Sequence, residues 1–129
     1  GNIKKLPNRI KKKLQETIKR TKNCKKILVN LAINYGSKDE ILNAIKLIKK
    51  RKLSISNKSF ERHLYTKDLP DPDILIRTGG KRRLSNFLLW QLAYSELYFL
   101  DKLWPDFTSL DFKKIIKNFK IVKRNFGKI

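Results

Sequence analysis

The segment between residues 70 and 99 constrains the fold of this chain more than any other part of it. A Pro-Asp-Pro-Asp opening forces an extended backbone into an apolar strand at residues 74–77. Gly79-Gly80 then permits a tight turn, and residues 85–94 have the aromatic and aliphatic spacing of a helix. A second short strand is expected at residues 97–99. This order of strand, turn, helix and strand is typical of a parallel sheet.

The first half of the chain also alternates between helical and strand patterns. Residues 8–22 carry apolar side chains at helical spacing, and residues 26–34 are nearly continuous apolar, which is typical of a strand buried on both faces. Ser37 with Glu40 forms a capping-box pattern. We therefore expect a helix from Ser37 with a buried stripe of Ile41, Ile45 and Ile48.

Two further helices complete the predicted elements. A short helix is expected at Lys58–Tyr65, with Phe60 and Leu64 facing inward. The last helix is expected to start at Thr108, with Asp111 at the capping-box position, and to bury Phe112, Ile115, Phe119 and Val122. The predicted fold class is α/β, a partial parallel sheet with flanking helices, in one domain of residues 1–129.

The strongly positive charge of the chain bears on whether it binds an anionic partner such as nucleic acid. The formal net charge is +21, which by itself favours nucleic acid or an anionic membrane face. Lysines far outnumber arginines, however, and are spread through helices and loops, whereas nucleic-acid surfaces rely on arginine. We therefore expect no nucleic-acid partner.

The single cysteine, Cys24, excludes an internal disulfide and fits a reducing compartment.

Basic residues and a hydroxyl surround the glycine turn. Arg77 ends its strand, and ligands in open α/β sheets lie beyond the carboxyl ends of the strands. Arg83 and Ser85 fall where the next helix is expected to begin, so its N–H groups and dipole favour an oxyanion. Gly79-Gly80 can supply further N–H donors in a nest. Two guanidiniums and a hydroxyl suit phosphate oxygens, so this turn is predicted to bind a diphosphate.

The carboxylates near this turn leave alternatives open. Arg77 could pair with Asp71 or Asp73 in a solvated loop. Glu96 ends an apolar segment, where a carboxylate needs a partner, and Mg²⁺ and an arginine are equally compatible with the sequence. The single histidine, His63, has no second ligand at metal spacing, so neither a zinc site nor a His-based triad is expected.

These motifs resemble those of the cis-prenyltransferases, and most closely the bacterial undecaprenyl diphosphate synthases (isoprenyl transferases). The similarity runs through a long region: Pro70-Asp71-Pro72-Asp73, Ile76-Arg77-Thr78-Gly79-Gly80, Arg83-Leu84-Ser85-Asn86-Phe87-Leu88-Leu89-Trp90-Gln91, Ala93-Tyr94-Ser95-Glu96-Leu97-Tyr98-Phe99 and Leu103-Trp104-Pro105-Asp106-Phe107. Fainter similarity extends to Leu31-Ala32-Ile33-Asn34-Tyr35-Gly36, which resembles the family's Asn-Tyr-Gly-Gly-Arg segment, and to Arg124-Asn125-Phe126-Gly127, which resembles its basic tail. Nearly the whole chain resembles only the carboxyl-terminal half of the family.

The resemblance implies an enzyme that condenses isopentenyl diphosphate onto an allylic diphosphate, usually farnesyl diphosphate, to make a long polyprenyl diphosphate. It implies that isopentenyl diphosphate is held by Arg77, Arg83, Leu84 and Ser85, and that Glu96 helps to bind Mg²⁺. It also implies the carboxyl-terminal part of the undecaprenyl diphosphate synthase-like fold and a homodimer joined through the aromatic segment after Ser85. A cytoplasmic location follows, with contact to the membrane only through the lipid product.

The sequence departs from the family in one important respect. The family's amino-terminal half carries an Asp-Gly-Asn-Gly-Arg loop that binds the allylic diphosphate and supplies a catalytic aspartate, and this chain contains neither Asp-Gly nor Asn-Gly. We therefore expect the chain to be a carboxyl-terminal portion with no catalytic residue and no turnover alone. Lys81 also stands where the family usually has Glu. Two other functions remain open: a non-catalytic binding or dimerisation module of a prenyltransferase complex, and a basic nucleic-acid binder.

Overall fold

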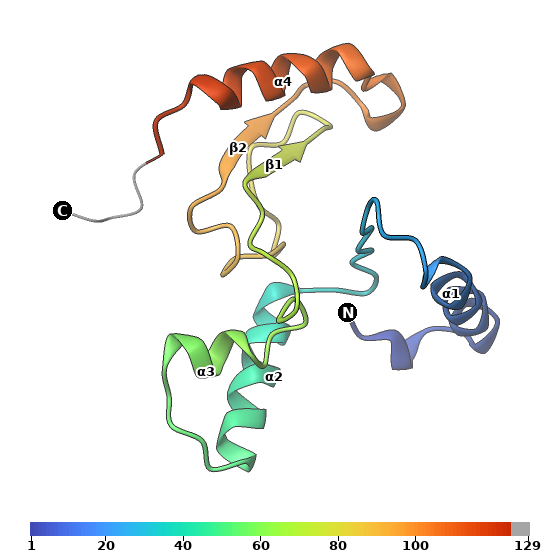
Figure 1. Cartoon of the computed structure of the whole chain (residues 1–129), viewed down its shortest axis with the longest axis vertical. Helices are drawn as coiled ribbons and strands as arrows, with labels where there is room; N and C mark the ends of the chain where they lie inside the picture. Colours follow the sequence, from blue (N-terminus) through green and yellow to red (C-terminus); the bar gives the residue numbers. More distant parts are fainter. Residues whose placement is uncertain (125–129) are drawn as a thin grey trace. The chain divides into compact units, whose positions relative to one another are not determined.

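A computed structural model describes residues 1–124 of the chain. The chain divides into two compact units, one from Gly1 to Tyr65 and one from Thr66 onward. Figure 1 shows that the first unit contains only helices and connecting segments, whereas the strands belong to the second. The α/β fold class predicted from the sequence is confirmed, with a small parallel sheet of two strands.

The first unit contains a 3₁₀ helix and three α-helices: η1 (Ile3–Lys5), α1 (Asn8–Thr21), α2 (Ser37–Lys50) and α3 (Asn57–Glu61). Its core consists of Ala44 and Ile48 from α2, Phe60 from α3 and Leu64, with Ile41 packed against them. The inward orientation predicted for Phe60 and Leu64 is confirmed, although α3 ends before Leu64. The α1 helix forms where its apolar spacing predicts it, but buries none of its residues.

The start of α2 differs from the prediction. Gly36, not Ser37, is the N-cap, and no side chain caps the helix. Ser37 and Glu40 are fully buried instead, because the Glu40 carboxylate accepts hydrogen bonds from the Tyr35 hydroxyl at 2.5 Å and the Tyr65 N–H at 2.7 Å. The buried stripe therefore runs through Ser37, Glu40, Ala44 and Ile48, while Ile45 is exposed.

The predicted strand at residues 26–34 is not formed. These residues adopt neither helix nor strand, and Ile27, Leu28 and Val29 are 77%, 77% and 73% exposed. A strand exists only when a neighbouring strand accepts and donates its backbone hydrogen bonds. Among the described residues, ladder pairing joins only two strands, and both lie in the second unit. The prediction fails because strand-type sequence cannot supply its own partner.

The second unit is built on two parallel strands, β1 (Ile74–Arg77) and β2 (Glu96–Phe99), followed by η2 (Trp104–Asp106) and α4 (Ser109–Ile121). In the register, Ile74 lies opposite Glu96 and Arg77 opposite Phe99, so the two strands start and end together. Figure 1 shows both arrows pointing the same way. The strand positions predicted from the sequence are confirmed.

The helix predicted at residues 85–94 is absent, and consecutive turns replace it. The reason is local backbone geometry. Ser85, Asn86 and Leu88 have φ values of 50°, 63° and 44°, in the left-handed region that an α-helix cannot accommodate. Single turns remain, such as the bond from the Phe87 N–H to the Leu84 carbonyl. The N-terminal oxyanion site expected at this helix therefore does not exist.

The last helix matches its predicted start. Thr108 is the N-cap of α4 and Asp111 completes the capping box. Its predicted buried face is only partly correct: Ile115 is buried, whereas Phe112 and Val122 are exposed. No helix among residues 1–124 is long and apolar enough to cross a membrane.

Candidate functional site

A cleft of about 340 Å³ opens where β1 ends. Its walls include all the residues predicted to hold isopentenyl diphosphate: Arg77, Arg83, Leu84 and Ser85. Thr78, Phe87 and the β1 residues Leu75 and Ile76 complete the lining. The chain reverses between Arg77 and Ser85, and this reversal brings the end of the strand and the following loop to the same cavity.

Arg77 is fixed by the loop that it faces. Its Nη1 atom donates to the Ser85 hydroxyl at 2.9 Å and to the Arg83 carbonyl. A guanidinium has five N–H donors in a planar fork, so these contacts orient the group and leave further donors for a ligand. The Ser85 hydroxyl accepts from Arg77 and keeps its own hydrogen to donate. The alternative pairing of Arg77 with Asp73 is not found, because Asp73 pairs with Arg124 at 2.5 Å.

The glycine turn contributes shape but not the expected N–H donors. Gly79 and Gly80 have φ values of +90° and +70°, which explains why glycine is needed there. Their N–H groups already donate to the carbonyls of Lys102, at 2.8 Å, and Leu100, at 2.9 Å. The predicted anion nest at Gly79-Gly80 is therefore wrong: these amides extend the backbone hydrogen bonding of the sheet instead.

Arg83 provides the accessible positive charge of the cleft. Its side chain is exposed and forms no described ion pair or side-chain hydrogen bond within residues 1–124. An unpaired guanidinium beside an oriented one can bind an oxyanion in bidentate fashion. The cleft thus combines one fixed and one free arginine.

The remaining walls of the cleft are apolar. Leu75, Ile76, Leu84 and Phe87 line it together with the arginines and hydroxyls. A cavity with cationic and apolar walls suits an amphipathic anion, because the charged end can meet guanidiniums while a hydrocarbon end leaves water. A phosphate ester with a short alkyl or alkenyl group has this chemistry.

Glu96 does not share this cleft. It begins β2, opposite Ile74, whereas Arg77 lies at the other end of the strand pair. Three residues along a strand separate the two positions by about 10 Å. The half-buried Glu96 carboxylate forms no described hydrogen bond or ion pair with residues 1–124. It can supply one oxygen ligand to Mg²⁺, which commonly takes one or two carboxylates together with phosphate oxygens and water.

The described residues supply no complete metal site. No cluster of at least three His, Cys, Asp or Glu side chains with metal-binding geometry occurs among them. His63 is held instead by local hydrogen bonds: Nδ1 donates to the Ser59 carbonyl at 2.7 Å, and Nε2 accepts from Arg51 at 3.4 Å. Both ring nitrogens of His63 therefore have partners within the first unit.

Sequence reasoning missed one interaction near Glu96. Arg124, which follows α4, pairs with Asp73 just before β1 and donates to the Tyr94 carbonyl at 3.0 Å, just before β2. Its guanidinium also lies 5.5 Å from the centre of the Phe119 ring. The only sequence signal was a basic residue at the end of the last helix. Arg124 and Asp73 are 51 residues apart in the sequence, so no local pattern could predict their pairing.

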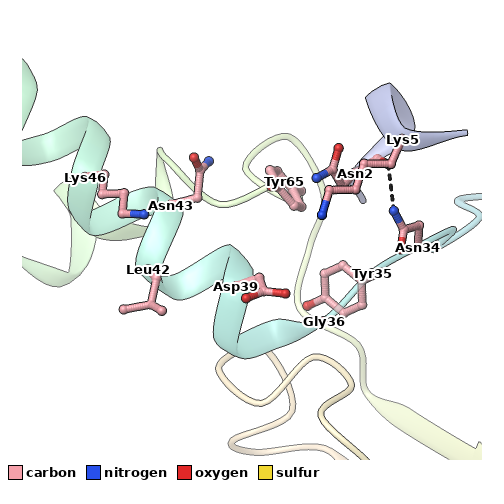
Figure 2. Close-up of a pocket in the computed structure, with 10 residues that line it drawn as sticks. All are labelled: Asn2, Lys5, Asn34, Tyr35, Gly36, Asp39, Leu42, Asn43, Lys46 and Tyr65. Carbon is pink, nitrogen blue, oxygen red and sulfur yellow. Dashed lines mark hydrogen bonds between the residues drawn. The ribbon is translucent and has the colours of Figure 1, made fainter.

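A second cavity, of about 320 Å³, lies in the first unit beside Tyr35 and Tyr65 (Figure 2). Its lining includes Lys5, Lys46 and Asp39, so charges of both signs face it. Figure 2 also shows the hydrogen bond from the Asn34 side chain to the Asn2 carbonyl, 2.9 Å long, at its rim. This mixture favours no one ligand class, and we assign it no function.

Comparisons with known proteins agree with the motifs. The prenyltransferase family model for undecaprenyl diphosphate synthases matches residues 1–127. The isoprenyl transferase of Thermotoga maritima is 46% identical over 132 residues, which cover 98% of this chain and 57% of the relative. A tritrans,polycis-undecaprenyl-diphosphate synthase (geranylgeranyl-diphosphate specific) from Thermoplasma volcanium is 44% identical, and the match covers 99% of this chain and 52% of the relative.

Solved structures show the same relationship. The crystal structure of a probable undecaprenyl diphosphate synthase from Campylobacter jejuni is 41% identical with a TM-score of 0.88, over 99% of this chain and 61% of the other. The crystal structure of lavandulyl diphosphate synthase from Lavandula x intermedia, in complex with dimethylallyl diphosphate, is 33% identical with a TM-score of 0.91, over 99% and 58%.

The parallel strands and these matches define the class of the chain: an α/β protein of the prenyltransferase family. The chain belongs to the undecaprenyl diphosphate synthase family, as its motifs predicted. It spans little more than half the length of the curated relatives that it matches.

Proposed function

We propose that this chain provides the isopentenyl diphosphate site of a cis-prenyltransferase, which condenses that substrate onto an allylic diphosphate to build a polyprenyl diphosphate. The observation that carries the proposal is the common cleft of Arg77, Arg83, Leu84 and Ser85. The diphosphate would lie against the two guanidiniums and the Ser85 hydroxyl. The five-carbon group would lie against Leu75, Ile76 and Phe87.

Each cleft residue has a distinct role in this proposal. Arg77, already oriented by Ser85, presents a fixed guanidinium, while Arg83 closes on the substrate from the exposed side. Both stabilise negative charge on the diphosphate. Glu96 contributes one ligand to Mg²⁺, at a place distinct from the cleft of the same chain, and Mg²⁺ would supply electrostatic stabilisation of a departing diphosphate. The aromatic segment after Ser85 would join a homodimer.

The test is isothermal titration of isopentenyl diphosphate against the chain, with and without Mg²⁺. Arg83→Ala should weaken binding roughly ten- to hundredfold, because a charge-assisted hydrogen-bonding partner is lost. Arg82→Ala is the matched control: Arg82 is a neighbouring exposed arginine that does not line the cleft. Equal effects of the two substitutions would show that general charge, and not the cleft, binds the ligand.

Turnover separates this proposal from a second candidate, a binding or dimerisation module without catalysis of its own. We expect no polyprenyl product when the 129-residue chain is incubated alone with isopentenyl diphosphate, farnesyl diphosphate and Mg²⁺. Product formed by radiolabelled isopentenyl diphosphate in that mixture would overturn this expectation. The allylic substrate is left open because one relative is named as geranylgeranyl-diphosphate specific and another structure holds dimethylallyl diphosphate.

A further inference from the structure

Residues 1–26 carry a large share of the positive charge of the chain. They contain eleven of its 32 Lys and Arg residues but only one of its 11 Asp and Glu residues, Glu16. Six of the eleven belong to α1: Arg9, Lys11, Lys12, Lys13, Lys19 and Arg20. The isopentenyl diphosphate cleft lies in the other unit and contains none of them. The proposed reaction therefore leaves this charge unexplained.

The α1 helix separates its charged residues from its apolar ones. At about 100° per residue, Ile10, Leu14 and Ile18 form one stripe along the helix. Lys12 and Lys19 are two turns apart and lie one above the other on nearly the opposite side. Whatever covers the apolar stripe therefore leaves these two lysines facing outward.

Most of the charge on α1 is not neutralised by the chain itself. Lys13 pairs with Glu16, at 3.5 Å. Four other exposed basic residues of the helix form no described ion pair within residues 1–124: Arg9, Lys12, Lys19 and Arg20. We call these four residues the basic face of α1. They present a continuous positive potential to any anionic surface that approaches the helix.

The kinds of residue near this face indicate the kind of partner. Four of the six basic residues of α1 are lysines, and residues 1–34 contain no Phe, Tyr or Trp. Nucleic-acid surfaces use arginine for bidentate contacts with bases and aromatic rings for base stacking. An anionic lipid bilayer requires neither, because several basic side chains on an amphipathic helix attract its headgroups without fixed geometry.

We propose that the basic face of α1 docks the chain on the surface of an anionic lipid bilayer. The helix lies along the surface, with its lysine and arginine side chains against the lipid phosphates. This attachment goes beyond the proposed function, but one reason for it rests on that function. A polyprenyl diphosphate has a long hydrocarbon chain that leaves water for a bilayer, so a docked enzyme releases this product where the product dissolves.

The experiment measures co-sedimentation of the 129-residue chain with two kinds of vesicle. One kind contains phosphatidylcholine and phosphatidylglycerol, and the other contains phosphatidylcholine alone. At about 100 mM NaCl, binding to the anionic vesicles should be at least about tenfold tighter than to the neutral ones. Raising NaCl to about 500 mM should abolish this preference, because salt screens exposed charges.

Paired substitutions test whether the basic face itself is responsible. Lys12→Gln with Lys19→Gln should weaken binding to the anionic vesicles roughly tenfold. Lys49→Gln with Lys50→Gln is the matched control, because it removes the same charge from exposed lysines of α2 in the same unit. The control should weaken binding by less than about threefold. All four lysines are exposed, so far-UV circular dichroism should be unchanged in both variants.

A second substitution should strengthen binding, which misfolding cannot imitate. Glu16 is one turn from both Lys12 and Arg20, so its carboxylate lies among the basic residues. Glu16→Gln should tighten binding to the anionic vesicles about threefold or more. Glu61→Gln, at an exposed carboxylate of α3 in the same unit, makes the same change of charge and should have a smaller effect.

Three outcomes would overturn the proposal. The first is equal binding to the anionic and the neutral vesicles. The second is equal weakening by the two lysine pairs, which would assign the attraction to net charge. The third is tighter binding of a single-stranded RNA oligonucleotide than of anionic vesicles at the same salt concentration, weakened by Lys12→Gln with Lys19→Gln. That result would assign the basic face to nucleic acid.

The same variant separates this proposal from the proposed function. Arg77 and Arg83 belong to the other unit, so the chain with Lys12→Gln and Lys19→Gln should bind isopentenyl diphosphate as the wild type does. Loss of vesicle binding with unchanged isopentenyl diphosphate binding supports the basic face as a separate site. Parallel loss of both would contradict it.

Discussion

Asp111 has the most strongly perturbed carboxylate among the described side chains. The Lys102 ammonium lies 2.9 Å from both of its oxygens, and the Thr108 hydroxyl and N–H donate to Oδ2 at 2.7 and 2.9 Å. The bond to Lys102, followed by those to Thr108, holds the pKa of Asp111 well below its ordinary value. All three interactions favour the ionised form, so they couple the start of α4 to the preceding loop through one charge.

This arrangement predicts a specific pH dependence. Because the folded-state pKa of Asp111 is lowered, its charge stabilises the fold above the ordinary carboxyl pKa of about 4, and that contribution is lost as the pH falls below it. Asp111→Asn should lower the urea midpoint at pH 7, and the difference from the wild type should shrink progressively below pH about 4. Asp68→Asn, at an exposed carboxylate without a described partner, serves as the control. A difference that stays constant down to pH about 2 would contradict the role of the charge.

At the scale of elements, the second unit is tied together by a side chain that belongs to none of its strands. Arg124, beyond α4, bonds Asp73 and the Tyr94 carbonyl, which stand just before β1 and β2. The strands begin in register beside this clamp. The strand pair is therefore held at its start by Arg124 and at its end by the backbone hydrogen bonds of Gly79 and Gly80.

The clamp predicts unequal effects of removing its partners. Arg124→Ala should lower the free energy of unfolding by about 1–2 kcal/mol, since it loses two hydrogen bonds and a ring contact. Asp73→Asn should cost at most about 0.5 kcal/mol, because the Asp73 side chain is largely exposed. Both are measured by urea unfolding, with Lys123→Ala, next to the clamp and exposed, as the reference. If Arg124→Ala lowered the free energy of unfolding no more than Lys123→Ala does, the Arg124 contacts would not stabilise the fold.

Across the whole molecule, basic side chains greatly outnumber acidic ones. The formal net charge is +21, and the described ion pairs (Lys13 with Glu16, Lys102 with Asp111, Arg124 with Asp73) involve few of the basic residues. Self-repulsion at this charge opposes the compact state. The comparisons place the chain in the undecaprenyl diphosphate synthase family.

Salt should therefore stabilise the chain. Raising NaCl from about 20 to 300 mM shortens the screening length from about 20 Å to below 10 Å and weakens the repulsion among lysines. We expect the melting temperature to rise by several degrees, measured by circular dichroism, and KCl to act in the same way. A melting temperature that is unchanged or lower at 300 mM would show that the charges are already balanced in the folded state.

Much of the candidate site was predictable because it is local. Arg77, Arg83, Leu84 and Ser85 lie within nine residues, and a glycine turn with φ values of +90° and +70° brings them to one cleft. The prediction failed for finer geometry. The Gly79 and Gly80 N–H groups donate to the carbonyls of Lys102 and Leu100, which are distant in sequence. Positive φ angles at three residues between 85 and 88 prevent the expected helix.

The sequence by itself determined the elements whose signals are short-range. These are the strand between the proline pair and the glycines, the Thr108–Asp111 capping box and the motifs that place the chain in its family. Only the tertiary structure decided three features: the burial of Glu40 with its hydrogen bonds from Tyr35 and Tyr65, the pairing of Arg124 with Asp73, and the failure of residues 26–34 to form a strand with any other described residues. The physical reason is that propensity and capping act between neighbours in the chain. Burial, ion pairing and strand pairing depend on partners that only the folded chain brings together.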